Sequence, residues 1–225
     1  MPADDGAAPA LTRDALTRAA LRVLERDGLA GLSMRKVAAE VGVKAASLYW
    51  HVRNKEELLD LLNDALMAEV EAPPREGDWR TQLRAYCERY RDHLLGKRDA
   101  AKVVAGRLAP GPNLFRLMEE QLDRLREAGF SAADAAMVSY LLGAYVQGFV
   151  LQEQSPVVSA DATGAGWREI TEATAERFRS LPPGEFPNLV AMAGDLTGPG
   201  LDARFAFGLD RILDGLAGLL PPGPR

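Results

Sequence analysis

The spacing of apolar residues predicts helices throughout the chain. They recur at helical intervals after Thr12, whose hydroxyl can cap a helix, as far as Gly28, which ends it. Ser33 can cap a second helix, and Gly42 breaks that helix because glycine adopts the left-handed backbone readily. No strand pattern, internal repeat or GxGxxG-like phosphate loop is visible. We therefore expect an all-α protein.

The segment from Ser33 to Lys55 has the spacing of a helix-turn-helix. Residues 41–44 form the turn, and a third helix is expected over Ala45–Val52, with Leu48 and Val52 pointing into the core. A helix this short must be held by its neighbours. Small residues at its start would let its backbone approach the edges of the base pairs.

Two aromatic residues in this segment allow two interpretations. Tyr49 and Trp50 either face a partner or are core aromatics, and Trp50 in particular could be partly buried. Successive helical residues cannot share one face, so at most one of the two packs inward in the same way as Leu48.

Further helices are expected beyond the turn. Asn54 begins one that runs to about Glu69, and Pro73 and Pro74 end it at the clearest internal boundary. The last two helices of the chain are apolar on more than one face. Residues 155–166 are expected to form a flexible loop that could gate a pocket, and residues 1–10 a disordered tail. The helices after the boundary are expected at residues 78–94, 98–108, 113–128, 131–154 and 201–220.

Composition narrows the function classes. At 225 residues and 47% hydrophobic composition the chain can bury a core without disulfides, and Cys87 has no internal partner. With two histidines and no Ser/His/Asp set or metal-ligand spacing, we expect no catalytic site, no metal and no cofactor. The first dozen residues resemble neither a signal peptide nor a membrane span, so a cytoplasmic protein without membrane contact is expected.

Charge adds a local signal. The formal net charge is −5, yet the segment Ser33–Lys55 has five bases and one acid, 5 − 1 = +4. A basic patch on an acidic protein would concentrate phosphate attraction at one surface. A solvated helix face with a chance excess of bases would look the same.

The stretch LSMRKVAAEVGVKAASLYWHVRNKEELLD resembles the DNA-binding domain of the TetR family of bacterial transcriptional repressors. The resemblance implies that Arg35 and Ser47 contact bases or nearby backbone, and that Tyr49, His51 and Lys55 hold phosphates. Tetracycline-sensing members have Gln-Pro at the start of the third helix, where this chain has Ala45 and Ala46, so its operator should differ. The expected DNA-binding set is Ser33, Arg35, Lys44, Ala45, Ala46, Ser47, Tyr49, Trp50, His51 and Lys55.

The rest of the chain resembles the bodies of the tetracycline-sensing members, which implies a homodimer paired through a four-helix bundle. The two most apolar helices, 131–154 and 201–220, would form it. These helices could instead be merely central in the monomer. The expected interface residues are Leu141, Tyr145, Phe149, Leu209, Ile212, Leu213 and Leu216.

The same resemblance implies a small-molecule pocket whose aromatic and amide groups suit a flat or amphipathic effector. Tyr86 and Tyr90 could equally be core residues with their hydroxyls at the surface. Where tetracycline-sensing members use a histidine and an acid for a drug–magnesium chelate, this chain has Val104 and Gln152. We therefore expect an aromatic or polyketide-like effector bound without metal. The expected pocket residues are Tyr86, Tyr90, Val104, Arg107, Leu108, Gln121, Leu125, Leu142 and Gln152.

The resulting prediction is a repressor that leaves double-stranded operator DNA when its effector binds. The alternative is the same DNA-binding head acting as an activator or responding to a protein partner. A helix-turn-helix domain is expected at 11–55, a connecting helix at 56–72, and a larger helical ligand-binding and dimerisation domain at 73–225.

Overall fold

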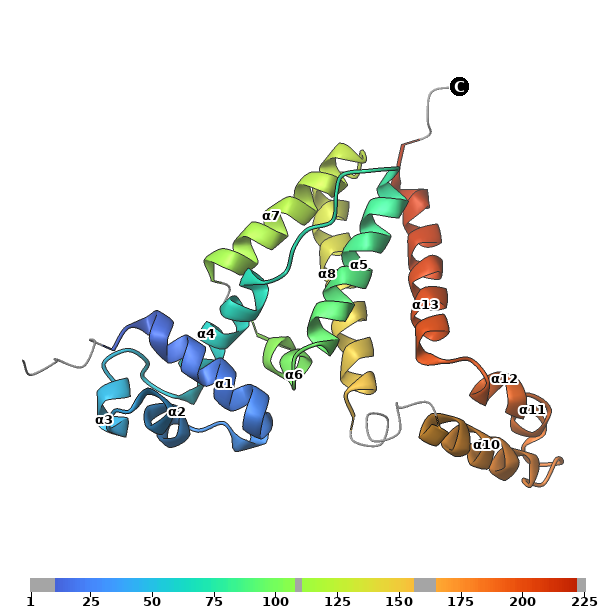
Figure 1. The fold of residues 1–225 in the computed structure, drawn as a ribbon. Coiled ribbons are helices and arrows are strands. Elements are labelled where there is room, and N and C mark those ends of the chain that lie inside the picture. Colours follow the sequence, from blue (N-terminus) through green and yellow to red (C-terminus); the bar gives the residue numbers. More distant parts are fainter. Residues whose placement is uncertain (1–10, 108–110, 156–164, 222–225) are drawn as a thin grey trace, which may run out of the picture. The chain divides into compact units, whose positions relative to one another are not determined.

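The computed structural model describes residues 11–107, 111–155 and 165–221. Every regular element in these ranges is helical, which confirms the expected all-α class (Figure 1). The helices are α1 (Arg13–Gly31), α2 (Met34–Val41), α3 (Ala45–Leu48), α4 (Lys55–Ala68), α5 (Trp79–Leu95), α6 (Ala100–Val104), α7 (Pro112–Glu127), α8 (Ala132–Glu153), α10 (Ala165–Arg179), α11 (Pro187–Ala191), α12 (Ala193–Thr197) and α13 (Leu201–Leu216), followed by a 3-10 turn, Ala217–Leu219.

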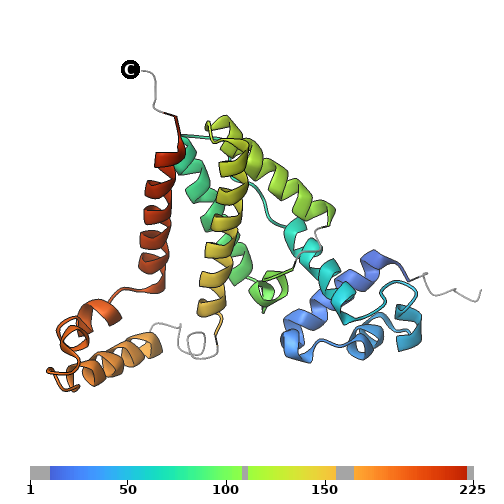
Figure 2. The same cartoon turned by 180° about the vertical axis from the view of Figure 1, so that it is seen from behind.

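The chain divides into two compact units. The first comprises residues up to Pro74 together with Glu88–Asp123, and the second comprises Arg75–Cys87 together with the residues from Arg124 onward. In the first unit α1 packs on α2 and α4, and α4 packs on α6. In the second unit α10 packs on α11 and α12, and α8 packs on α13. Figure 2 shows the same helices from behind.

Helix starts in the head follow the capping residues predicted from sequence. The hydroxyl of Thr12 accepts a hydrogen bond from the Ala15 N–H, and the hydroxyl of Ser33 accepts one from the Lys36 N–H. Asn54 caps α4 in the same way through the Glu57 N–H at 2.8 Å. Each bond satisfies a donor that helix geometry leaves open, which is why these starts can be predicted locally.

Glycines end α2 and bend α1. Gly42 has φ 79°, a left-handed conformation, and its N–H donates to the carbonyls of Ala38 and Ala39. Gly28, with φ 70°, interrupts α1 before its last turn. Gly42 ends α2 as predicted, whereas α1 bends at Gly28, its predicted end, and continues to Gly31. A residue with a side chain would be strained at either glycine.

The third helix is shorter than predicted. It spans only Ala45–Leu48, and residues 49–51 form a turn rather than a continuation to Val52. The N–H groups of His51 and Val52 both donate to the Leu48 carbonyl. This tight turn carries the chain directly from Leu48 to Val52, and both side chains are fully buried.

Helix α8 begins at the predicted cap, Ser131, whose hydroxyl accepts from the Asp134 N–H. By length and composition alone it is apolar enough to cross a membrane, yet its Tyr145 stacks on Phe205 of α13 at 5.3 Å between ring centroids. The Tyr145 hydroxyl also donates to the Phe205 carbonyl at 2.7 Å. Specific contacts therefore join α8 to α13 in the second unit.

Three helices, α10, α11 and α12, were not predicted. The gating loop expected at residues 155–166 lies mostly outside the described residues, but its last two residues, Ala165 and Gly166, begin α10. The tail expected at residues 1–10 and the candidate Leu108 also lie outside the described residues.

Candidate DNA-binding surface and effector region

The recognition segment, residues 45–52, packs on the core of the head through buried apolar side chains. Leu48 and Val52 are fully buried, together with Val37 of α2 and Leu58 of α4. A four-residue helix has too few internal hydrogen bonds to persist alone, so this core positions α3. The residues between the two anchors are thereby presented outward.

The aromatic pair after α3 faces solvent. Trp50 is 90% exposed and Tyr49 is 55% exposed, so the interpretation of Trp50 as a core aromatic is wrong. His51 is half-buried, and Ala46 is exposed beside the half-buried Ala45 and Ser47. The outward surface predicted for this segment is therefore open to a partner.

Most basic residues of the head are neutralised by acids. The nine Lys and Arg residues between positions 11 and 72 include six with an ion pair. Glu40 holds Arg22 and Arg26, at 2.9 and 2.8 Å, and joins α2 to α1. Hydrogen bonds from Arg26 and Lys36 lower the pKa of Asp27 to about 2, so this carboxylate stays ionised at physiological pH.

The three remaining bases are Arg35, Lys44 and Lys55, and none has an acidic or hydrogen-bonding side-chain partner in the described part of the chain. All three lie at helix N-termini: Arg35 is the second residue of α2, Lys44 precedes α3, and Lys55 is the first residue of α4. A cation there opposes the helix dipole rather than complementing it. An anionic partner outside the chain would supply the missing charge.

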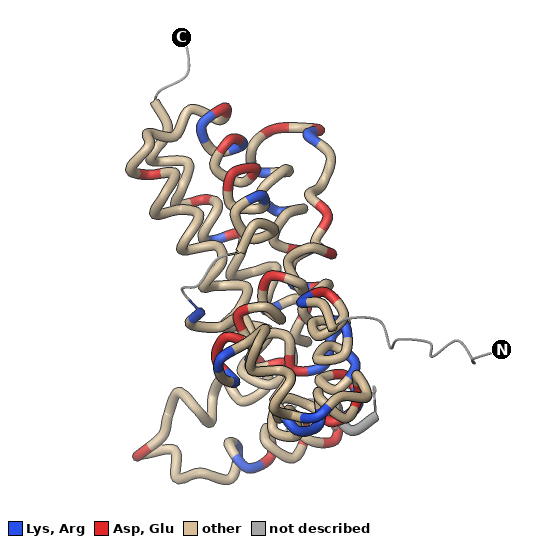
Figure 3. Tube along the Cα trace, turned by 90° about the vertical axis from the view of Figure 1, so that its left-hand side faces the viewer, with Lys and Arg blue, Asp and Glu red and all other residues tan. Residues whose placement is uncertain are grey.

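Figure 3 marks the basic and acidic positions along the trace. Basic and acidic side chains of α1 and α2 form ion pairs with one another, as in the hydrogen bond from Lys36 to Asp27 at 2.8 Å. The three unpaired bases belong to the set predicted to contact DNA, whereas Lys36 and Arg53, which also contributed to the local excess, are paired with acids.

Helix α4 is fastened to residues on both sides of 108–110. Arg107, predicted to contact the effector, instead donates to Asp60 at 2.8 Å and to Glu56 at 2.9 Å, so it binds the first half of α4. Its side chain is only 16% exposed. The chain segment that follows α6 is thereby tied to α4.

The second half of α4 caps α7. Asp64 Oδ1 accepts from the N–H groups of Asn113 and Leu114, at 2.9 and 3.2 Å, and its Oδ2 accepts from the Asn113 side chain. Gly111 is needed here because a β-carbon would collide with the Asp64 side chain. Sequence reasoning missed Asp64, since its partners lie 49 and 50 residues away.

A third connection reaches the end of α1. Arg98 donates to the carbonyls of Glu25 and Arg26, at 3.3 and 2.7 Å, and Asp99 accepts from the Leu29 N–H at 2.8 Å. Asp99 has φ 55°, unusual for a residue with a side chain. The bend at Gly28 leaves these backbone groups open, so the segment between α5 and α6 completes the end of α1.

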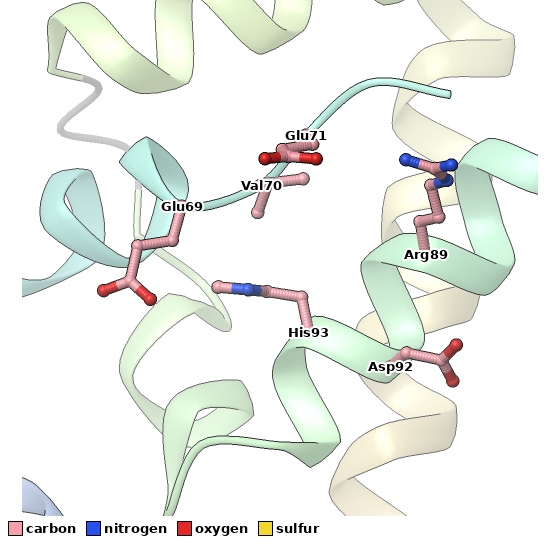
Figure 4. A pocket seen from close by; sticks show the side chains of 6 residues that line it. All are labelled: Glu69, Val70, Glu71, Arg89, Asp92 and His93. Carbon is pink, nitrogen blue, oxygen red and sulfur yellow. The ribbon is translucent and has the colours of Figure 1, made fainter. Parts of the chain in front are cut away.

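A shallow pocket of about 220 Å³ lies between the end of α4 and α5 (Figure 4). Glu69, Glu71 and Asp92 make it acidic, but Lys97 already binds Glu69 at 2.6 Å. His93 points toward Glu69, and burial lowers the pKa of His93 despite that carboxylate. Within the described residues no group of three or more His, Cys, Asp or Glu could hold a metal ion.

The residues predicted to bind an effector are divided between the two units. Tyr90, Val104, Arg107 and Gln121 belong to the first, whereas Tyr86, Leu125, Leu142 and Gln152 belong to the second. Because these residues belong to different units, their assembly into one pocket stays a prediction. Both tyrosines are half-buried, Val104 is 6% exposed and Gln121 is 7% exposed.

The predicted dimer residues separate into two groups. Leu209 and Leu213 are fully buried and Leu216 is 5% exposed, so these three side chains pack inside the protomer. Tyr145 and Phe149 are half-buried against Phe205, and Ile212 is also half-buried. Leu141 is 43% exposed, and sequence reasoning missed the more exposed Met137, Tyr140 and Phe207.

Comparison with known proteins agrees with this arrangement. Residues 16–62 match the family model "Bacterial regulatory proteins, tetR family", and residues 72–220 match "Tetracyclin repressor-like, C-terminal domain". The class A tetracycline repressor from transposon 1721 of Escherichia coli is 38% identical over 210 residues, covering 92% of this chain and 91% of the relative.

Solved structures of relatives have the same fold. ActR of Streptomyces coelicolor, in complex with actinorhodin, is 35% identical with a TM-score of 0.85, covering 96% of this chain and all of that chain. BioQ, known from Mycobacterium smegmatis, in complex with its double-stranded DNA operator, is 27% identical with a TM-score of 0.66, covering 92% of this chain and 99% of that chain. The chain belongs to the TetR family of bacterial transcriptional regulators.

Proposed function

We propose that this protein is a homodimeric repressor that binds double-stranded operator DNA and leaves it when an aromatic or polyketide-like molecule binds the body without metal. The observation that carries the DNA-binding part is the position of Arg35, Lys44 and Lys55. Three unpaired cations at three helix N-termini are unfavourable for the isolated chain and favourable beside phosphates. The relatives named as a repressor and as an operator complex support this assignment.

Dimerisation would bring two such surfaces to one operator. On α8, Met137, Tyr140, Leu141 and Ala144 recur at helical spacing, and all are exposed. Only 28% of the most apolar 18-residue stretch of this helix is buried in the single chain. Phe207 of α13 adds a side chain that is 67% exposed. A second copy packed on these residues, in a bundle of α8 and α13 from both protomers, would remove this apolar surface from water.

The switch is proposed to act through α4. This helix follows the DNA-binding head directly, and Arg107 and Asp64 tie it to the chain on either side of residues 108–110. An effector that prefers a different arrangement of α6 and α7 would pull on these bonds and shift α4. The ligand needs only a few kcal/mol of differential affinity, roughly 3 to 5, to change operator occupancy by orders of magnitude.

The effector class follows from the residues at two positions. Val104 has no ligand atom, and Gln152 has a neutral amide where a magnesium-bound water shell would favour a carboxylate. Tyrosines and amides suit an aromatic ligand with several polar substituents. The structure of the relative ActR in complex with actinorhodin supports a small-molecule effector.

The test begins by capturing genomic fragments with the purified chain and sequencing them. Gel shifts on the recovered operator would then be run with aromatic polyketides, and with tetracycline in the presence of magnesium or a chelator. We expect release by a polyketide-type ligand that persists in the chelator. Release by tetracycline that disappears with the chelator would contradict the metal-free effector.

Repression is tested separately. A reporter placed behind the recovered operator should be more active in a deletion strain than in the wild type. Lower reporter activity after deletion would instead support the activator alternative. If operator affinity stayed unchanged across all the ligands tested, the small-molecule switch would be rejected in favour of a protein partner.

A further inference from the structure

One of the three unpaired cations differs from the others in its position. Lys44 immediately precedes α3 with an extended backbone, φ −72° and ψ 144°, and its side chain makes no capping hydrogen bond. All three are exposed, but Arg35 and Lys55 belong to the starts of the flanking helices α2 and α4, whereas Lys44 adjoins α3. In helix-turn-helix proteins the N-terminal residues of the recognition helix contact base edges, while the first helix of the motif crosses the backbone.

The residues that follow Lys44 have few side-chain groups that could form hydrogen bonds with base edges. Ala45 and Ala46 have no side-chain donor or acceptor, and Ala46 is exposed. Ser47 is half-buried and short, and its N–H donates to the Lys44 carbonyl at 2.9 Å. A serine hydroxyl both donates and accepts, so it discriminates weakly between bases. Hydrogen-bond readout at the start of α3 therefore falls mainly to Lys44.

We propose that Lys44 reads a guanine in each operator half-site, an inference that rests on the proposed operator binding. Lysine has three donors and no acceptor. In the major groove guanine alone presents two adjacent acceptors, N7 and O6, whereas adenine and cytosine present a donor at their exposed edge. The two alanines leave the groove beside Lys44 free of bulky groups, so its flexible stem can reach the base.

The experiment selects binding sites from random double-stranded DNA with the full-length wild type, Lys44→Gln and Lys55→Gln. The wild-type motif should contain a strongly preferred G·C pair in each half-site that depends on Lys44. Lys44→Gln should lose this preference by roughly 5- to 150-fold and gain adenine there, because glutamine pairs with adenine N6 and N7. Lys55→Gln, the matched control, should weaken binding to all sequences without changing the motif.

A chemical substitution in the DNA isolates the contact. Replacing the preferred guanine with 7-deazaguanine removes the N7 acceptor and should weaken wild-type binding but leave Lys44→Gln nearly unaffected. If Lys44→Gln keeps the wild-type motif and only loses affinity uniformly, Lys44 is a phosphate contact and the inference is overturned. If the wild type enriches no motif, the proposed operator binding itself fails as well. Circular dichroism would confirm that each variant is folded.

Discussion

Two surfaces of this chain expose side chains that the chain itself neither pairs nor buries, and the two surfaces differ in chemistry. In the head, Arg35, Lys44 and Lys55 are cations without an acidic partner among the described residues, whereas the six other bases between residues 11 and 72 are all ion-paired. On α8 and α13 the exposed side chains are instead large and apolar, since Tyr140 and Phe207 are 74% and 67% exposed.

The difference indicates two partners of different chemistry. Unpaired cations are well solvated by water and stabilise only a complex with an anion, so binding at the head should depend strongly on salt. Exposed apolar side chains are instead unfavourable in water, so that face should be covered even when DNA is absent. A change on the apolar face should consequently affect assembly, and a change on the head should affect DNA binding in an assembled dimer.

The largest effect is expected from a charge placed on the apolar face. Leu141→Glu would put a carboxylate without a partner into the proposed interface, at a cost of about 3–5 kcal/mol. We expect monomers in sedimentation velocity and an operator affinity lowered by roughly 100-fold or more, because each monomer reads a single half-site.

The matched control for that change is Phe115→Glu, which also replaces an exposed apolar residue, 56% exposed on α7. It should leave the sedimentation coefficient and operator affinity close to those of the wild type. A dimeric Leu141→Glu variant with unchanged operator affinity would place the partner-binding surface elsewhere.

The next effect concerns the support of the recognition segment. Leu48→Ala would open a cavity beneath α3 and lower the free energy of unfolding by about 2–5 kcal/mol. Urea denaturation should show an earlier midpoint, and operator binding should weaken where the dimer persists. Leu48→Met nearly conserves volume and should cost less than about 1.5 kcal/mol. Equal midpoints for Leu48→Ala and the wild type would show that the segment is held by other contacts.

Local hydrogen bonding explains which parts of the fold were predictable. Thr12, Ser33, Asn54 and Ser131 each cap a helix through an N–H three residues away, so a short window of sequence contains the whole interaction. The length of α3 was not predictable in this way, because it is set by the turn that returns Val52 to the core.

Periodicity located the apolar helices but not their outward faces. Leu209, Leu213 and Leu216 have the spacing of an interface stripe, yet they are buried in their own protomer. Because α8 and α13 are apolar on more than one face, spacing cannot show which face the monomer buries. The bonds from α4 to Arg107 and Asn113 were invisible for a similar reason, since they join residues 47 to 51 positions apart.

A smaller effect should separate operator binding from its regulation. Arg107→Ala would remove the contacts with Glu56 and Asp60, so an effector would pull less on α4. We expect the ratio of operator affinities without and with effector to fall about tenfold, within the usual coupling of about 1–3 kcal/mol. The measurement is a titration by fluorescence anisotropy.

Lys102→Ala is the control for Arg107→Ala because it removes a nearby cation that binds Asp99 instead of α4. It should preserve the affinity ratio. An Arg107→Ala protein with the wild-type ratio would show that the switch does not use this connection.

The smallest effect tests a group that belongs to neither surface. His93 lies in the last turn of α5 and faces the end of α4, where burial and Lys97 lower its pKa below the ordinary 6.5 while Glu69 opposes the shift. Well above pH 6.5, His93 is neutral in both the folded and the unfolded chain and contributes no pH dependence to stability. As the pH falls below 6.5, the unfolded chain binds a proton at His93 before the folded chain does, so the free energy of unfolding declines.

His93→Gln should remove this component, so its free energy of unfolding should fall less than that of the wild type between about pH 7.5 and 5.5. Urea denaturation at both pH values measures the difference, and His51→Gln, which replaces the other histidine of the chain, is the control. If His93→Gln and the wild type lose the same stability on acidification, burial at the end of α4 does not hold His93 neutral. If the wild type and His93→Gln also differ in how much operator affinity they lose over this pH range, protonation of His93 affects DNA binding through α4. Operator affinity would then depend on pH as well as on salt.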